Sequence, residues 1–379
     1  MNKKCKIVSF LLTFIIFLQF FGGFSAKTAR AKVIEECYES MITIEKKTGR
    51  ILFEKDKDKK LPMASTTKIL TALVAIENTE DLHQKHKIPK EAIGVEGSSI
   101  YLKENEELSL KELLYGLMLR SGNDAAVAIA IIIAGSVENF VKLMNAYCIK
   151  LNLKNTHIVT VNGLHDAEHY TSASDLAKIT SMAMGNEVFK EIVETKEIVI
   201  NSTLDNKNKC RLLKNKNKLL KMVDGATGVK TGYTTKAGKC FVGSASRNGL
   251  EVICVVLNAR SMFDECAALI EKSFAEFRRI KLFSKGEILS KESAEKGGLK
   301  SSIILKDDIY YVLTRDELLR LKAKINLNEN NKHAEGLIDI GTIDFVIENN
   351  LIFSEKIYTI KGKKISSLKE NFNKIIRSF

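Results

Sequence analysis

Tryptophan is absent from the 379-residue chain, proline occurs only twice, and the 22 glycines are too few for a collagen repeat. Hydrophobic residues make up 45% of the chain and charged residues 28%. This balance is typical of a globular protein and excludes a largely disordered chain and a membrane protein with many spans. The length allows one large domain and a smaller second one.

The sequence also lacks the usual signs of a metal site. No two cysteines have the C-x-x-C spacing and the 6 histidines form no cluster, so we expect neither zinc nor any other cofactor. The cysteines beyond the N-terminal segment are expected to be buried small hydrophobic residues, although some could pair outside a cell. They are Cys37, Cys148, Cys210, Cys240, Cys254 and Cys266.

The N-terminal residues 1–31 have the layout of a secretory signal peptide. A basic start is followed by an apolar run from Ile7 to Phe24, and Ala29-Arg30-Ala31 fits an A-x-A cleavage site. The alternative is a retained anchor helix. Cleavage would lower the formal charge from +13 to about +8. An exported, basic protein suits anionic envelope polymers or lipid headgroups, so we expect an extracytoplasmic location and no nucleic-acid partner.

The pattern over residues 32–280 predicts one α/β sandwich. A hairpin is expected around Lys47–Arg50, strands after Val223, and a last helix from about Asp264 to Arg279. Between them lie amphipathic and fully apolar helical segments, one of which opens with the capping box Ser109-Leu110-Lys111-Glu112. Strands on both sides of a helical middle predict a sheet closed by the two ends of the domain.

Two further segments complete the predicted organisation. Residues 281–360 alternate with period two and predict a small all-β domain. Residues 361–379 predict an amphipathic helix with a local charge of +5, because six basic residues stand against Glu370. Such a helix can lie on a membrane surface, and the alternative is that it docks on its own domain.

The motif Ser65-Thr66-Thr67-Lys68 precedes a strongly apolar helix. At this spacing the two side chains share one helix face, and a neutral lysine amine can take the proton of a serine hydroxyl. The same pattern occurs at Ser293–Lys296 and at Ser366–Lys369, where no apolar helix follows, so we interpret those copies as solvated surface.

Two more motifs follow in the chain. Ser121-Gly122-Asn123 lies at a break between two apolar helices, where serine can relay a proton and asparagine can bind an amide. Lys230-Thr231-Gly232, followed by Tyr233, enters a strand; the lysine and threonine can fix a carboxylate, and glycine permits close approach of a substrate backbone. Ser246-Arg247-Asn248 and Lys47-Thr48-Gly49 match the same patterns in expected turns.

The order S-x-x-K, S-x-N, K-T-G resembles the penicillin-recognising serine enzymes. The longer contexts, among them PMASTTKILTALVAIE, RSGNDAAVAIA and DGATGVKTGYTTKAGKC, look like the low-molecular-mass D-alanyl-D-alanine carboxypeptidases. The resemblance covers about residues 36–280, and the β domain and terminal helix also look like those of this family. It implies a β-lactamase/transpeptidase-like sandwich and a peptidoglycan stem peptide ending in D-Ala-D-Ala as substrate.

By this resemblance Ser65 is the nucleophile, Lys68 the base, and Ser121 a proton relay to the leaving amine. Asn123 would hold the peptide amide, and Lys230 would keep the site positive. Thr231 would bind the terminal carboxylate, and the backbone N–H groups of Ser65 and Tyr233 would form the oxyanion hole. β-Lactams would acylate Ser65 because they present a reactive amide of similar shape.

The sequence departs from the family at Val161-Asn162-Gly163-Leu164-His165, where relatives often carry Asn-Pro-His-Gly-Leu. This shortened loop lies outside the three motifs and puts local geometry in doubt. We expect His157, His165 and His169 to be structural or exposed and Arg260 to be a surface residue. The alternatives are a class A-like β-lactamase, for which no convincing E-x-x-x-N loop is found, and a non-catalytic envelope-binding protein.

Overall fold

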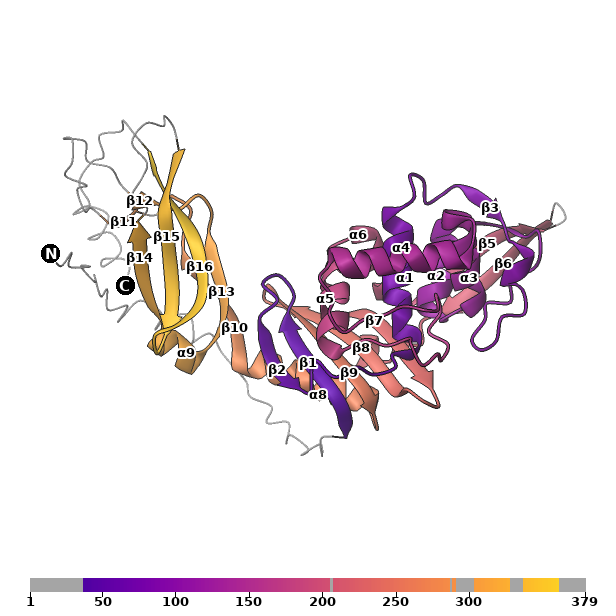
Figure 1. The fold of residues 1–379 in the computed structure, drawn as a ribbon, viewed down its shortest axis with the longest axis horizontal. Helices are drawn as coiled ribbons and strands as arrows, with labels where there is room; N and C mark the ends of the chain where they lie inside the picture. The colour runs from indigo at the N-terminus through magenta and orange to yellow at the C-terminus, as the bar shows by residue number, and fades with distance from the viewer. Residues whose placement is uncertain (1–36, 205–206, 287, 291–302, 328–336, 361–379) are drawn as a thin grey trace. The chain divides into compact units, whose positions relative to one another are not determined.

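The computed structural model describes residues 37–204, 207–286, 288–290, 303–327 and 337–360. The predicted signal peptide and the predicted terminal helix therefore lie outside the described residues. The chain divides into two compact units between Glu276 and Phe277 (Figure 1).

The first unit is built on a five-stranded antiparallel sheet with the strand order β2-β1-β9-β8-β7. Strand β1 pairs with β9 from Tyr38 opposite Ala259 to Glu45 opposite Val252, so the two ends of the unit close the sheet as predicted. Strand β7 lies at the edge and pairs with β8. The strands are β1 (Tyr38–Glu45), β2 (Ile51–Lys55), β7 (Ala226–Thr234), β8 (Gly238–Arg247) and β9 (Leu250–Ala259).

Helices α1 to α6 gather at one side of this sheet (Figure 1). Helix α1 is central, because its residues 68–76 are all buried. The predicted capping box of α2 is confirmed, since Ser109 and Glu112 bond reciprocally. The helices are α1 (Lys68–Glu77), α2 (Leu110–Leu119), α3 (Asn123–Ala134), α4 (Val137–Lys150), α5 (Ala173–Ala183), α6 (Glu187–Glu194), α7 (Leu219–Met222) and α8 (Met262–Glu276), with 3-10 turns η1 (Ala64–Thr67) and η2 (Lys90–Ala92).

A second, four-stranded sheet in this unit was not predicted. It has the order β3-β4-β5-β6 and comprises β3 (Lys85–Lys87), β4 (Glu107–Ser109), β5 (Glu197–Leu204) and β6 (Lys207–Lys214). Its longest hairpin, β5–β6, exposes many of its side chains, including Val199 and Leu212. Apolar and polar residues do not alternate regularly in either strand, because Ile198–Ile200 are consecutive and Leu212 is next to Leu213. The main sequence signal of a strand is therefore missing.

The helix expected to continue to Arg279 ends instead at Glu276. Residues Phe277–Phe283 form strand β10, which pairs with β13 (Ile309–Thr314) in a two-stranded sheet. Sequence periodicity places element ends only approximately, and the pairing partner of β10 lies some thirty residues further along the chain. The second unit therefore begins at Phe277, four residues before the expected boundary.

The second unit is a small β domain, as predicted. Beside the β10–β13 pair it has a five-stranded sheet of order β11-β12-β16-β15-β14 and one short helix. Its core includes a stack in which the Tyr311 and Phe353 rings lie 4.0 Å apart and the Phe353 and Phe345 rings 4.3 Å apart. The remaining elements are β11 (Ile288–Ser290), β12 (Ile303–Ile304), α9 (Arg315–Arg320), β14 (Lys322–Leu327), β15 (Leu337–Ile347) and β16 (Asn350–Ile360).

In the described part of the chain, no single helix is long and apolar enough to cross a membrane. Helices α3 and α4 pass that test only when taken together, and they are bent by 85° where they meet.

Candidate active site

Ser65 and Lys68 lie at the entrance to the buried helix α1. Ser65 is half-buried in the turn η1, and Lys68 is the first residue of α1. The Lys68 Nζ atom donates to Ser65 Oγ at 2.9 Å. Lys68 follows Ser65 by three positions in the chain, so one helical turn is enough to bring the amine against the hydroxyl.

The Lys68 side chain is completely buried and bonded to three oxygen atoms. Beyond Ser65 Oγ, Nζ donates to Asn123 Oδ1 at 2.7 Å and to the Asn162 carbonyl at 2.6 Å. Burial, followed by the positive charges of Lys230 and Lys216, holds the pKa of Lys68 well below its usual range, with Asp124 opposing the shift. The environment therefore favours a neutral amine that is able to accept a proton.

The Ser121-Gly122-Asn123 motif forms the break between α2 and α3. Ser121 and Asn123 are both buried, and Ser121 has a left-handed backbone with φ of 63°. Asn123 Nδ2 donates to the Glu96 carbonyl at 2.5 Å, which leaves Oδ1 to accept from Lys68. Both ends of the Asn123 amide thus make a hydrogen bond within the protein, and Oδ1 helps to orient Lys68. The binding of a peptide amide by Asn123 stays a prediction.

Asp124, which the sequence analysis did not single out, ties a second loop to the site. Its carboxylate is buried and accepts hydrogen bonds from Ser99 Oγ at 2.6 Å and from the backbone N–H groups of Ile100 and Leu102. Asn123 N–H donates to the Ser98 carbonyl at 2.6 Å. An acidic residue in the first turn of a helix is a common feature, so the sequence carried no sign that this one would hold a loop.

Lys230, Thr231, Gly232 and Tyr233 lie on the edge strand β7. Lys230 is buried and donates from Nζ to the Thr231 carbonyl at 2.9 Å, whereas the Tyr233 side chain is 65% exposed. Burial and the charge of Lys216 lower the pKa of Lys230 to about 7. The structure thus brings a second lysine with a weakened hold on its proton to the neighbourhood of Lys68.

Gly232 allows β7 to lie directly against the turn that carries the nucleophile. A Cβ atom at this position would lie 3.1 Å from each of Met63 O, Ser65 N and Thr66 N. From the sequence, this glycine is expected to permit the approach of a substrate backbone. The close approach in the structure is to η1 itself.

The loop Val161–His165, which departs from the family pattern, lies within the site. Its Asn162 carbonyl accepts from Lys68 and, at 3.5 Å, from Ser65 Oγ. Gly163 has φ of 83°, and a Cβ there would lie 2.0 Å from Ala64 O. A side chain is therefore excluded at this position, and the shortened loop still delivers a backbone oxygen to Lys68.

Lys216 is a third cation of the site and was also missed. Its Nζ donates to Ser98 Oγ at 3.3 Å, and its charge lowers the pKa values of both Lys68 and Lys230. It belongs to Asn215–Lys218, a short segment before α7 without hydrophobic periodicity. In a chain with 59 basic residues, one more lysine gives no sequence signal.

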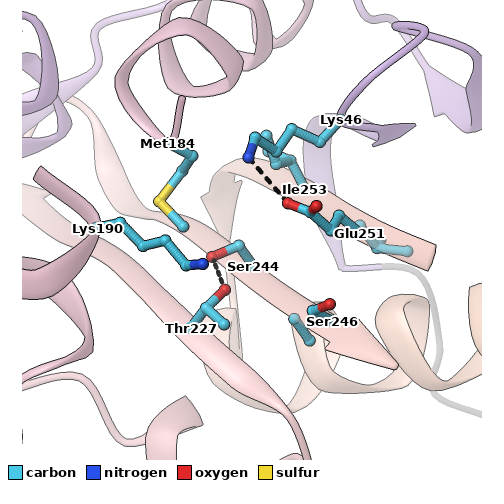
Figure 2. Close-up of a pocket in the computed structure, with 10 residues that line it drawn as sticks. Lys46, Met184, Lys190, Thr227, Ser244, Ser246, Glu251 and Ile253 are labelled. Carbon is cyan, nitrogen blue, oxygen red and sulfur yellow. Dashed lines mark hydrogen bonds and ion pairs between the residues drawn. The ribbon is translucent and has the colours of Figure 1, made fainter. Parts of the chain in front are cut away.

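The pocket drawn in Figure 2 is separate from this arrangement. It lies where β8 and β9 meet the end of α5 and α6, and it contains the Lys46–Glu251 ion pair of 2.9 Å and the 2.8 Å contact between the Thr227 and Ser244 hydroxyls. No residue of Ser65–Lys68, Ser121–Asn123 or Lys230–Gly232 lines it, and its volume of about 60 Å³ is far too small for a peptide.

Fold and site together define a serine peptidase, and comparison with known proteins agrees. The family model described as D-alanyl-D-alanine carboxypeptidase matches residues 26–261, and that of the penicillin-binding protein 5 C-terminal domain matches residues 277–364. D-alanyl-D-alanine carboxypeptidase DacF of Bacillus subtilis is 32% identical over 336 residues, 86% of either chain. DacA of Escherichia coli K12 is 30% identical over 369 residues, covering 92% of this chain and 89% of its own.

Solved structures show the same likeness over both units. Penicillin-binding protein 5 of Haemophilus influenzae superposes with a TM-score of 0.73 at 26% identity, covering 87% of this chain and 98% of its own. The carboxypeptidase DacD of Francisella tularensis gives 0.70 at 25% identity, covering 91% and 99%. The chain therefore belongs to the family of serine D-alanyl-D-alanine carboxypeptidases, the low-molecular-mass penicillin-binding proteins of peptidoglycan maturation.

Proposed function

We propose that Ser65 attacks the carbonyl carbon between the two terminal D-alanines of a peptidoglycan stem peptide. Lys68 takes the hydroxyl proton, Oγ bonds to the carbonyl carbon, and the carbon–nitrogen bond to the last D-alanine breaks. Ser121 passes a proton to the leaving amine, and water then hydrolyses the ester and restores Ser65. The observation that carries this proposal is the 2.9 Å contact between a buried, weakly basic amine and the Ser65 hydroxyl.

The backbone N–H groups of Ser65 and Tyr233 are proposed to stabilise the oxyanion. Support comes from Gly232, because a Cβ there would lie 3.1 Å from Ser65 N, so β7 runs beside the donor on η1. A preorganised donor of this kind is typically worth ~3 kcal/mol in the transition state. Substitution of either residue leaves its N–H in place, which is why neither donor has a sequence signature.

Lys230 and Thr231 are proposed to bind the terminal carboxylate of the substrate. A carboxylate brought near Lys230 favours the charged ammonium, which burial and Lys216 otherwise disfavour. Binding of the substrate carboxylate therefore raises the pKa of Lys230 and favours the ammonium form that binds this carboxylate. β-Lactams carry a carboxylate beside a strained amide and are expected to use the same groups.

Incubation of the protein with diacetyl-Lys-D-Ala-D-Ala tests the proposal, and release of free D-alanine is the expected result. Penicillin should give one covalent adduct on Ser65 that is released slowly. Rapid penicillin turnover would instead identify a β-lactamase, and the absence of both reactions would identify a non-catalytic envelope binder.

Replacement of Lys216 by glutamine should move the pH profile of acylation upward. Removing this charge raises the pKa values of Lys68 and Lys230 because the charge lowers both. Acylation needs a neutral Lys68, so the acid limb of the profile, where the rate rises with pH, moves to higher pH. Substrate binding needs a charged Lys230, so the alkaline limb, where the rate falls, also moves to higher pH. Rate constants with a fluorescent penicillin check this, with Lys216→Arg as the charge-retaining control. If neither limb of the pH profile moves in Lys216→Gln, the charge of Lys216 does not affect the pKa values of the site.

We further propose that residues 1–31 are a cleaved signal peptide and that the enzyme works at the outer face of the cytoplasmic membrane or in the cell wall. The proposal rests on the apolar run and the A-x-A sequence, and a peptidoglycan substrate requires that location. The proposed organisation is completed by the peptidase domain up to Glu276, the β domain from Phe277 to about residue 360 and the terminal helix.

The segment 361–379 is proposed to attach the enzyme to the membrane surface through its apolar face and its charge of +5. Deletion of residues 362–379 should release the protein into the soluble fraction, with D-alanine release retained. Fractionation of cells that express each form measures this, and high salt should weaken the attachment of the full chain. A truncated protein that still sediments with membranes would show that the anchor lies elsewhere.

A further inference from the structure

His169 is a buried histidine of which both ring nitrogens are engaged. It is 3% exposed and lies in the segment before α5. Its Nδ1 accepts from the backbone N–H groups of Val159 at 3.0 Å and Thr160 at 3.3 Å. Because Nδ1 faces two donors, the hydrogen-bond network assigns the proton to Nε2, which lies 2.8 Å from Thr67 Oγ1.

On one side the imidazole reaches the turn that carries the nucleophile. Nε2–H donates to Thr67 Oγ1, and Thr67 Oγ1 donates in turn to the Ala64 carbonyl at 2.7 Å. Ala64 directly precedes Ser65 and has a left-handed backbone with φ of 48°. A non-glycine residue in this region is strained and persists only where its surroundings hold it, and this chain of hydrogen bonds is one such restraint.

On the other side the imidazole holds the loop that contacts Lys68. Thr160, whose N–H donates to His169, accepts from Gly163 N–H at 3.2 Å through its hydroxyl and donates to the Leu164 carbonyl at 3.3 Å. These bonds close the loop around Asn162, the carbonyl of which accepts from Lys68 Nζ at 2.6 Å. Gly163 packs directly on Ala64, so the loop and the turn are in contact.

We propose that His169 is a positioning residue of the reaction, joining the Ser65 turn to the Asn162 loop at the separation that Lys68 bridges. The inference rests on the proposed function, since it assigns a role within that mechanism. It goes beyond the motifs, which contain no histidine, and it distinguishes His169 from His157 and His165, both of which are exposed.

The protonation state of the ring supports this role. Burial lowers the pKa of His169 to about 4; Asp166 opposes the shift, and the charges of His157 and His165 add to it. A proton on Nδ1 would face the two N–H groups of Val159 and Thr160 and break both bonds. The neutral ring is therefore the form that joins the two segments, and it persists throughout the pH range above about 5.

The test compares the pH profiles of acylation by a fluorescent penicillin for the full-length wild type, His169→Ala and His169→Asn. The control is His83→Gln, at an exposed histidine in the segment before β3 and outside the site. His169→Ala should lower the plateau rate constant by about 10- to 100-fold, because small displacements of reacting groups are costly. The acid limb of its pH profile should also move to lower pH. The Asn162 carbonyl favours the ammonium form of Lys68, so losing this contact lowers the pKa of Lys68. His169→Asn, which can place an oxygen near the position of Nδ1, should recover part of both effects.

Destabilisation without a positioning role would give a different result. Simple destabilisation would lower the fraction of active protein and leave the acid limb of the pH profile in place. If the variant unfolded in acid, the limb would move to higher pH. Either outcome would overturn the proposal. Should His169→Ala fail to fold, the asparagine variant and the nitrogen-15 shifts of His169 in the wild type still decide, since a proton found on Nδ1 contradicts the assigned network. A wild type that penicillin does not acylate would refute the proposed function instead.

Discussion

Ser65→Ala should lower D-alanine release by about 10⁵- to 10⁶-fold, the range seen when a serine hydrolase loses its nucleophile. Without Oγ no acyl-enzyme forms, and the remaining groups only bind and polarise the substrate. The fold should be retained, because Ser65 is half-buried and Lys68 keeps its bonds to Asn123 and Asn162. Released D-alanine and the mass of the penicillin-treated protein measure the two halves of the reaction.

The chain supplies a matched control for this variant. Ser293 begins the second S-x-x-K sequence, which we interpret as solvated surface, so Ser293→Ala should behave as the wild type. If Ser65→Ala still releases D-alanine, or still gains the mass of penicillin as the wild type does, Ser65 is not the nucleophile. Loss of activity in Ser293→Ala alone would move the nucleophile to the other motif.

Lys68→Met should abolish acylation almost as completely, with a loss of up to about 10⁴-fold. Methionine is apolar and of similar length, so it fills the buried position without a group that can accept the Oγ proton. Lys68→Arg keeps a cation but cannot lose its proton, and it should be equally inactive. Lys296→Met is the matched control in the second S-x-x-K sequence. An active Lys68→Arg would show that charge, and not proton transfer, is what this position supplies.

The same substitution should change how stability depends on pH. In the folded protein the pKa of Lys68 lies below its unfolded value, so between the two values the unfolded chain binds more protons and the free energy of unfolding rises with pH. Lys68→Met should show a smaller rise, with Lys230 still contributing above about pH 7. The variant also leaves Asn123 Oδ1 without a donor, at a cost of about 1–3 kcal/mol, whereas the Asn162 carbonyl keeps its 3.5 Å contact with Ser65 Oγ. Urea unfolding between pH 7 and pH 10 measures both effects.

The sequence by itself determined the class of the enzyme and the frame of its fold. The S-x-x-K pair is local, since one helical turn sets the contact between Lys68 and Ser65. The hairpin strands after Val223 and the capping box of α2 are local too, because each depends on neighbours within a few residues. The order of the three motifs was specific enough to indicate the family.

Only the tertiary structure decided what surrounds Lys68 and holds the nucleophile in place. The Asn162 carbonyl comes from 94 residues away and Asn123 from 55. Every residue carries a backbone carbonyl, so a carbonyl ligand leaves no trace in the sequence. Three other features likewise come only from the tertiary structure. They are the effect of the Lys216 charge on the lysine pKa values, the hydrogen bonds of Asp124 to the Ser99–Leu102 loop, and the bonds of His169 to two segments. Each depends on a distance between segments far apart in the chain, which packing of the sheet and helices around α1 sets.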